Sequence, residues 1–182
     1  MRALVVYESM FGNTRAVALA VADGISTLMA VESVEVGAAP TQLPEDLALL
    51  VVGGPTHAHG MTTPETRADA SQRAGDRLVS HGIGMREWLD RVRPGPTPVA
   101  AAAFDTRIKG PGLLWGSAAK PAAKSLQAAG FRFLPPPRSF LVGGPTGPLF
   151  DRLVVGELDR AREWGVSLAA ALLEPVGARR SR

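Results

Sequence analysis

Apolar and polar positions divide the chain into segments of two kinds. Three segments, 3–8, 46–54 and 97–105, are runs of mainly apolar residues rich in Val, Leu and Ala. Continuous apolar runs of this length are typical of strands that are buried on both faces of a sheet. Segment 33–39 instead alternates apolar and polar residues, which predicts a short strand at or near the edge of the sheet.

The last predicted strand, 131–142, contains three consecutive prolines, Pro135, Pro136 and Pro137. Proline has no backbone N–H and cannot donate a hydrogen bond to a neighbouring strand. We therefore expect an edge strand that is broken or bulged at the prolines.

Segments with helical spacing separate the strands. Helices are predicted over 14–29, 84–92 and 117–130 and from about residue 156 onward, and a further helix is predicted after Pro64. Strands that alternate with helices in this way predict a parallel sheet covered by helices on both faces, which is an α/β fold.

The ends of the 117–130 helix have their own signals. Ser117 is the predicted N-cap and Gly130 the predicted stop. Trp88 and Trp164 are flanked by other apolar residues at helical spacing, and both are expected in the core.

Composition narrows the functional classes. A length of 182 residues with 46% apolar and 20% charged residues fits a single domain, 1–182, with a sizeable core. The chain has no cysteine, which excludes disulfides, cysteine-ligated metals and a cysteine nucleophile, and agrees with a cytoplasmic location. No stretch reaches ~18 consecutive apolar residues, so no membrane span is expected.

The net charge of +3 is mildly basic. The basic residues are dispersed and lack interleaved aromatic residues, so nucleic-acid binding is not expected. The basic tail from about residue 176 is expected to be frayed and solubilising, with nucleic-acid binding as a weak alternative.

The turn at 9–14 carries the clearest chemical signal. It joins a buried strand to a helix, and the first N–H groups of a helix, together with its dipole, favour an anion. Ser9, Asn13 and Thr14 add short polar side chains, and Gly12 permits a close backbone approach. The turn lacks the Gly-Lys-Ser/Thr of a P-loop, so a monophosphate fits better than a triphosphate. The alternative is a polar turn in which Thr14 is simply a helix cap.

This turn resembles the phosphate loop of the flavodoxin family, Ser/Thr-x-Thr-Gly-x-Thr. Ser9, Gly12 and Thr14 match the pattern, and Phe11 departs from it. The letters SMFGNT are also similar to the SMYGH loop of flavodoxin-like NAD(P)H:quinone oxidoreductases. The resemblance implies a three-layer αβα sandwich with a five-stranded parallel sheet in the order 2-1-3-4-5, and FMN as cofactor.

Two further segments extend the resemblance. GPTHAHG after the 46–54 strand resembles the family's second flavin loop, and the segment that begins at Phe104 lies where the third loop is found. The cofactor-binding residues that the resemblance implies are Ser9, Met10, Phe11, Gly12, Asn13, Thr14, Pro55, Thr56, His57, Ala58, His59, Gly60, Phe104, Asp105, Thr106 and Arg107.

No catalytic triad, paired catalytic carboxylates or metal cluster is evident, so the flavin is expected to supply any chemistry. His57 and His59 are two residues apart but lack a strong third metal ligand. The resemblance implies a redox or electron-transfer protein whose partner is a redox protein or a small quinone-like acceptor. Two alternatives remain open, an FMN-dependent NAD(P)H:quinone-type oxidoreductase and a binding module of the same fold without flavin.

Overall fold

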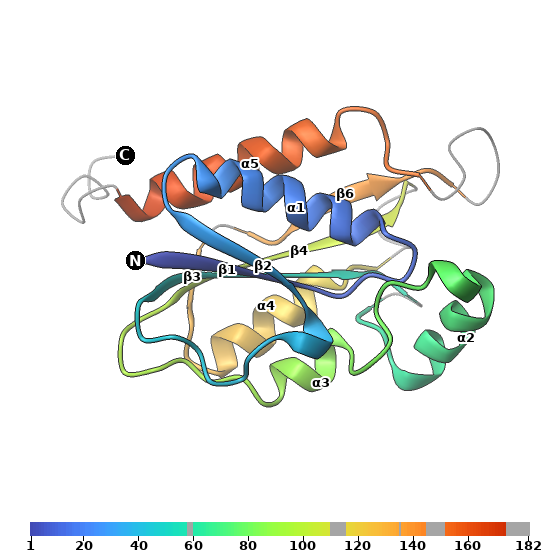
Figure 1. Cartoon of the computed structure of the whole chain (residues 1–182), viewed down its shortest axis with the longest axis horizontal. Coiled ribbons are helices and arrows are strands. Elements are labelled where there is room, and N and C mark those ends of the chain that lie inside the picture. Colours follow the sequence, from blue (N-terminus) through green and yellow to red (C-terminus); the bar gives the residue numbers. More distant parts are fainter. Residues whose placement is uncertain (58–59, 110–115, 135, 145–151, 174–182) are drawn as a thin grey trace.

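The computed structural model describes residues 1–57, 60–109, 116–134, 136–144 and 152–173 (Figure 1). The strands are β1 (Arg2–Tyr7), β2 (Ala30–Glu35), β3 (Leu47–Pro55), β4 (Ala100–Ile108), β5 (Arg132–Phe133) and β6 (Arg138–Val142). The α-helices are α1 (Asn13–Ser26), α2 (Pro64–Ala74), α3 (Met85–Leu89), α4 (Ala119–Ala128) and α5 (Glu157–Leu173). Short 3₁₀ turns occupy η1 (Val36–Ala38) and η2 (Gly75–Arg77).

The strands form one parallel sheet in the order β2-β1-β3-β4-β5, and β6 also pairs with β4. β5 pairs with Ala100 and Ala101, whereas β6 pairs with β4 from Phe104 to Ile108. The two short strands therefore occupy successive parts of the same edge position. This confirms both the predicted strand order and the predicted break at the prolines.

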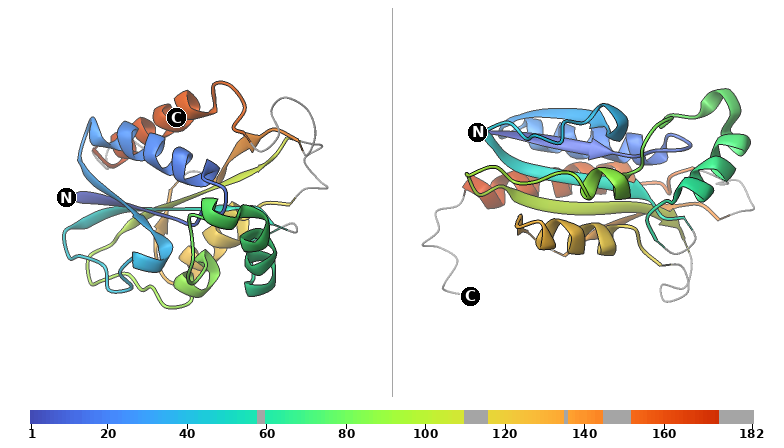
Figure 2. Two further views of the ribbon diagram at one scale, coloured as in Figure 1. Left: turned by 45° about the vertical axis from the view of Figure 1, so that its right-hand side comes forward. Right: turned by 90° about the horizontal axis from the view of Figure 1, so that it is seen from below.

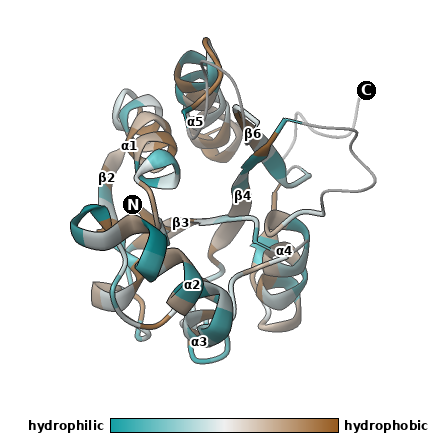
Figure 3. Cartoon of the chain, turned by 90° about the vertical axis from the view of Figure 1, so that its right-hand side faces the viewer, coloured by the Kyte–Doolittle hydropathy of each residue, from teal (hydrophilic) through white to brown (hydrophobic). Residues whose placement is uncertain are grey.

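Helices cover both faces of the sheet (Figure 1). α1 and α5 lie on one face, and α3 and α4 lie on the other. Figure 3 shows the more hydrophobic sides of these helices turned toward the sheet. The first face includes Val5, Phe104 and Trp164, and the second includes Val6 and Trp88. Both tryptophans are buried, as predicted.

α1 and α5 pack so closely that glycine is required at the contact. A Cβ added at Gly24 lies 2.0 Å from the Arg162 carbonyl oxygen, and one added at Gly165 lies 2.2 Å from the Val21 carbonyl oxygen. Both contacts are with backbone atoms, which cannot turn aside as a flexible side chain can. The two small residues therefore set the spacing of the helices.

Two element boundaries differ from the sequence prediction. The edge strand covers Ala30–Glu35 instead of 33–39, because its register pairs Arg2 with Ala30 and Tyr7 with Glu35. The cap position of α4 is Ala118, one residue after the predicted Ser117, although the Ser117 hydroxyl oxygen does accept from the Lys120 N–H at 3.3 Å. Gly130 has a φ of 96° just after α4, and this left-handed conformation agrees with the predicted stop.

Within the described ranges, no helix is long and apolar enough to cross a bilayer. α2 stands apart from the two helical layers. Figure 2 shows it beyond the ends of the central strands, at the edge where β3 and β4 finish.

Candidate functional site

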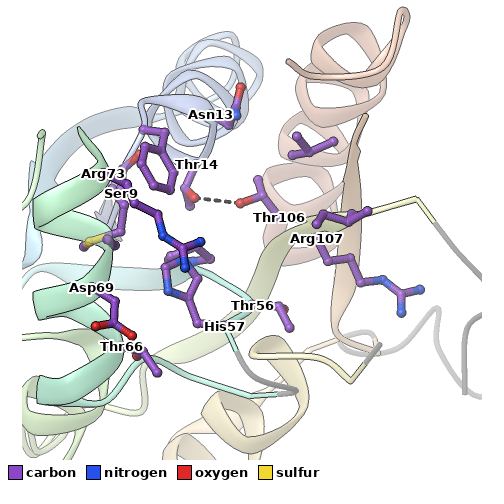
Figure 4. A pocket seen from close by; sticks show the side chains of 16 residues that line it. Ser9, Asn13, Thr14, Thr56, His57, Thr66, Asp69, Arg73, Thr106 and Arg107 are labelled. Atoms are coloured by element: carbon purple, nitrogen blue, oxygen red, sulfur yellow. Dashed lines mark hydrogen bonds between the residues drawn. The ribbon is translucent and has the colours of Figure 1, made fainter. Parts of the chain in front are cut away.

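A cavity of about 370 Å³ lies at the carboxyl edge of the sheet (Figure 4). Its size falls within the ~300–1,000 Å³ typical of small-molecule sites. Residues predicted as cofactor contacts that line it are Ser9, Met10, Phe11, Asn13, Thr14, Pro55, Thr56, His57, Thr106 and Arg107. Thus the fold brings together residues of all three loops singled out in the sequence.

The turn between β1 and α1 presents hydrogen-bond donors to this cavity. The Ser9 hydroxyl oxygen accepts from the N–H groups of Gly12, at 3.1 Å, and Arg15, at 3.2 Å. A hydroxyl has two acceptor lone pairs and one hydrogen, so these bonds leave the Ser9 hydrogen to be donated. Gly12 occupies the N-cap position of α1 with a φ of 93°, and it has no side chain that could cap the helix. The α1 N-terminus and the Ser9 hydroxyl therefore favour an anion.

Thr14 and Thr106 meet across the cavity wall. Their hydroxyl oxygens are 2.7 Å apart, and Figure 4 shows this bond joining α1 to β4. Whichever hydroxyl accepts this bond keeps its own hydrogen for another acceptor. The pair therefore links the first and third loops and offers one further donor.

The segment that follows α2 is bonded directly to the first loop. Val79 N–H donates to the Met10 carbonyl at 3.2 Å, and Ser80 N–H donates to the Ser9 carbonyl at 2.9 Å. The Ser9 N–H donates in turn to the Ser80 hydroxyl at 3.0 Å. These three bonds fix the end of the α2 segment against the first loop.

Glu8 is a buried carboxylate immediately before this loop. It accepts hydrogen bonds from the Thr62 hydroxyl, at 2.5 Å, and from the Met85 N–H, at 2.7 Å. Arg67 bonds both Thr62 and Glu87, and its charge lies near Glu8. Burial raises the pKa of Glu8 above its usual value, with the two hydrogen bonds and Arg67 acting in the opposite direction. Glu8 thus ties the end of β1 to the segments before α2 and at the start of α3.

Asp105 joins the second and third loops beneath the cavity. One of its carboxylate oxygens, Oδ2, accepts from the Thr56 hydroxyl at 3.2 Å, the Ser117 hydroxyl at 2.5 Å and the Ala119 N–H at 3.1 Å. The bond to Ala119 N–H satisfies one backbone donor in the first turn of α4, so Asp105 shares the capping of this helix with Ser117. Asp105 is completely buried and does not line the cavity, so it positions the loops.

Phe104 and Gly60 also lie outside the set of lining residues. Phe104 is buried in edge-to-face contact with Phe140 and Trp164 under the α1–α5 layer. It is therefore a core residue, and its place among the predicted flavin contacts reflects only its position next to Asp105. Gly60 exchanges two backbone hydrogen bonds with His57 and closes the second loop. Ala58 and His59 fall outside the described residues.

His57 is half-buried at the floor of the cavity. Burial lowers the pKa of His57, and the positive charge of Arg73 lowers it further. A hydrogen bond with the Thr66 backbone acts in the opposite direction. Burial and the charge of Arg73 thus both favour the neutral imidazole. Within the described ranges, no group of three or more His, Cys, Asp or Glu side chains could hold a metal ion.

Arg107 is directed away from the centre of the cavity. Its Nη1 donates to the Gly116 carbonyl at 3.2 Å, and Figure 4 shows the guanidinium pointing away from Thr14. Arg107 thus lines the cavity as predicted, but its head group supports the third loop.

Four lining residues come from α2 and were not predicted, namely Thr66, Asp69, Ala70 and Arg73. The sequence does carry a signal for the helix itself, because Thr63 and Thr66 form a capping box and Pro64 occupies the first turn. It carries no signal for where the helix packs. That place is set by the bonds of Ser80 and Val79 to the first loop.

No protein-family model and no curated protein matches the chain. Solved structures do. A flavodoxin from the domain Archaea superposes with a TM-score of 0.62 at 21% identity, over 96% of this chain and 100% of that one. Oxidised Flavodoxin 2 from Bacillus cereus gives a TM-score of 0.63 at 15% identity, over 94% and 99%. This chain has the flavodoxin-like fold.

The same fold occurs as part of larger proteins. The flavodiiron protein from Giardia intestinalis matches with a TM-score of 0.58 at 17% identity, over 94% of this chain and 36% of that one. The flavodoxin-like fold of the present chain carries β6 as an additional strand segment on β4. At these identities the likeness concerns the fold, and function must be argued from the cavity.

Proposed function

We propose that the chain is an FMN-binding redox protein that transfers electrons to a partner protein or a small quinone-like acceptor. The observation that carries the proposal is the Ser9 hydroxyl, whose two lone pairs are occupied by backbone N–H groups at the start of α1. This arrangement leaves the hydroxyl hydrogen of the cavity-lining Ser9 for a further acceptor beside a helix N-terminus, which suits a phosphate monoester.

The rest of the cavity fits the remainder of FMN. The second loop supplies Pro55, Thr56 and His57, and the third supplies Thr106 and Arg107, so both sides of a flat ring can be contacted. In the proposed arrangement the phosphate lies on residues 9–14, and Ala58, His59 and Gly60 continue the second loop. The whole chain is proposed to act as a single flavodoxin-like domain.

FMN, when bound, supplies the capacity to accept and release electrons, and the protein supplies binding and orientation. Asp105 holds the second and third loops at a fixed spacing through Thr56 and Ser117. Phe11 is 36% exposed at the rim, where the family pattern has a threonine. Its ring shields the phosphate position from water without donating a hydrogen bond.

A second candidate is an FMN-dependent NAD(P)H:quinone-type oxidoreductase. The observation that favours it is α2, which adds Thr66 and Asp69 as polar groups along one side of the cavity. Such a wall offers contacts to a small acceptor beyond those needed for FMN. Rapid oxidation of NAD(P)H by the flavin-loaded protein, with and without a quinone, distinguishes this enzyme from an electron carrier.

The proposal is tested by comparing FMN with riboflavin, which lacks the phosphate. The protein is titrated with each ligand while flavin fluorescence is followed. In the double variant Ser9→Ala/Thr14→Ala, FMN binding is expected to weaken by ~10-fold or more, since a hydrogen bond to a charged group contributes ~1.5–3 kcal/mol. Riboflavin binding is expected to change little.

The matched control is Ser26→Ala/Thr27→Ala, which removes two hydroxyls at the opposite end of α1. There the hydroxyls bond only to the carbonyls of Asp23 and Gly24. This variant is expected to bind FMN as the wild type does. Equal losses of FMN and riboflavin in the first variant contradict the phosphate assignment, and a wild type that binds neither ligand contradicts the proposed function itself.

A further inference from the structure

Arg73 lies in the last turn of α2 and lines the cavity. In Figure 4 its side chain extends from α2 into the cavity, and the guanidinium lies between Thr14 and His57. Its charge also acts on the half-buried His57 ring, whose pKa it lowers. Arg73 therefore brings a positive charge to the cavity from a helix that the sequence did not connect with the site.

The guanidinium of Arg73 is available to a ligand. Within the described ranges, Arg73 forms neither an ion pair nor a hydrogen bond with a protein group. Asp69, one turn earlier on α2, lies at the lower side of the cavity near Thr66, and its carboxylate points away from Arg73 in Figure 4. The only other described arginine that lines the cavity, Arg107, donates to the Gly116 carbonyl.

The first loop itself provides no cation inside the cavity. Arg15 is exposed in the first turn of α1 and does not line the cavity. Its backbone N–H, rather than its charge, takes part in the loop through the Ser9 hydroxyl. A phosphate monoester on this loop would thus be held by neutral donors and the helix dipole alone.

The backbone places Arg73 close to that loop. Residues 79 and 80 follow α2 and η2 after a few residues, and their N–H groups bond to the carbonyls of Met10 and Ser9. The Ser9 N–H closes the connection by donating to Ser80. The C-terminal end of α2 is therefore held at the phosphate side of the cavity, while its N-terminal end is held through Thr62 and Glu8.

We propose that Arg73 is a phosphate-binding residue, which supplies from α2 the positive charge that the 9–14 loop lacks and which makes the site selective for a flavin bearing a phosphate monoester. This inference rests on the proposed binding of FMN and adds a residue and a source of selectivity to it. A guanidinium can donate two parallel hydrogen bonds to phosphate oxygens, and lysine cannot reproduce that geometry.

The test compares Arg73→Gln with Arg77→Gln, which removes the charge of another exposed arginine from the same segment at a position outside the cavity. Both variants change the net charge by the same amount and are expected to fold, because neither arginine has a described ion pair. FMN and riboflavin affinities are measured by fluorescence titration at low and at high ionic strength, and folding is verified by circular dichroism.

Arg73→Gln is expected to weaken FMN binding ~10-fold at low ionic strength while riboflavin binding stays unchanged. The difference in FMN affinity between the wild type and Arg73→Gln should become smaller at high ionic strength, because salt screens the exposed charge. Arg73→Lys is expected to recover only part of the loss. Arg77→Gln should match the wild type for both ligands.

Two results overturn the inference. Equal weakening of FMN and riboflavin places Arg73 on the flavin ring rather than on the phosphate, and unchanged FMN binding in Arg73→Gln removes its role altogether. In both cases a wild type that still prefers FMN leaves the proposed function standing. If the wild type binds no FMN, the proposed function and this inference fail together.

Discussion

Glu8 provides the most direct test of how the site is built. The change Glu8→Gln removes the buried charge but keeps a side chain that can accept from Met85 N–H and bond to Thr62. Glu8 is 1% exposed, and its two partners lie 2.7 Å and 2.5 Å away. We expect the difference in unfolding free energy between the wild type and Glu8→Gln to depend on pH.

The sign follows from burial. Burial raises the pKa of Glu8 in the folded state, so the folded protein binds the proton more tightly than the unfolded chain does. The contribution of Glu8 to stability is therefore greatest below the unfolded-state pKa and is lost as the pH rises through the folded-state pKa. The slope for one proton cannot exceed ~1.4 kcal/mol per pH unit. Relative to Glu8→Gln, the wild type should lose stability as the pH rises from about 4.5 toward neutrality.

The change Glu8→Ala gives a second measure of the same network. It leaves the Met85 N–H and the Thr62 hydroxyl without their acceptor, and each unsatisfied buried group costs ~1–3 kcal/mol. The expected destabilisation is therefore ~2–6 kcal/mol.

Denaturant unfolding from about pH 4.5 to about pH 7.5 measures both variants. Glu32→Gln is the matched control, because Glu32 is exposed on the edge strand β2 and its side chain has no described hydrogen bond. A wild type that gains stability relative to Glu8→Gln as the pH rises contradicts the argument from burial. A pH-independent difference contradicts it as well.

Two further predictions concern packing and loop positioning. Gly165→Ala is expected to lower stability by ~1–3 kcal/mol despite the better helix propensity of alanine, because its Cβ would lie 2.2 Å from the Val21 carbonyl oxygen. Thermal unfolding measures the loss. The control Gly95→Ala should show no such loss, because a Cβ there meets nothing within 4 Å. Asp105→Asn is expected to lower stability by ~1.5–3 kcal/mol, because an amide weakens the three hydrogen bonds that one carboxylate oxygen accepts. An unchanged melting temperature would show that Asp105 does not hold the second and third loops together.

The sequence by itself determined most of the local elements. Continuous apolar runs identified β3 and β4, because strands buried on both faces have no polar side. The prolines at 135–137 predicted the break between β5 and β6, since a missing N–H is a local property of the residue. The turn at Ser9 and Gly12 could also be recognised locally, because a strand, a short polar turn and a helix follow one another in the chain.

The strand order came from the resemblance to a known family, not from the periodicity, because residue patterns do not state which strands are neighbours. The exact start of β2 was also beyond the sequence. It depends on pairing with β1, where Tyr7 lies opposite Glu35. Register is set by two segments together, so neither segment alone contains it.

Only the tertiary structure decided which residues share the cavity. Phe104 and Asp105 are adjacent in sequence, but successive residues of a strand point to opposite faces, and so Phe104 enters the core while Asp105 joins two loops. Arg73 comes into the cavity because hydrogen bonds between residues more than 60 positions apart fix α2 against the first loop. Local patterns cannot encode such contacts, since their energy exists only when both segments are in place.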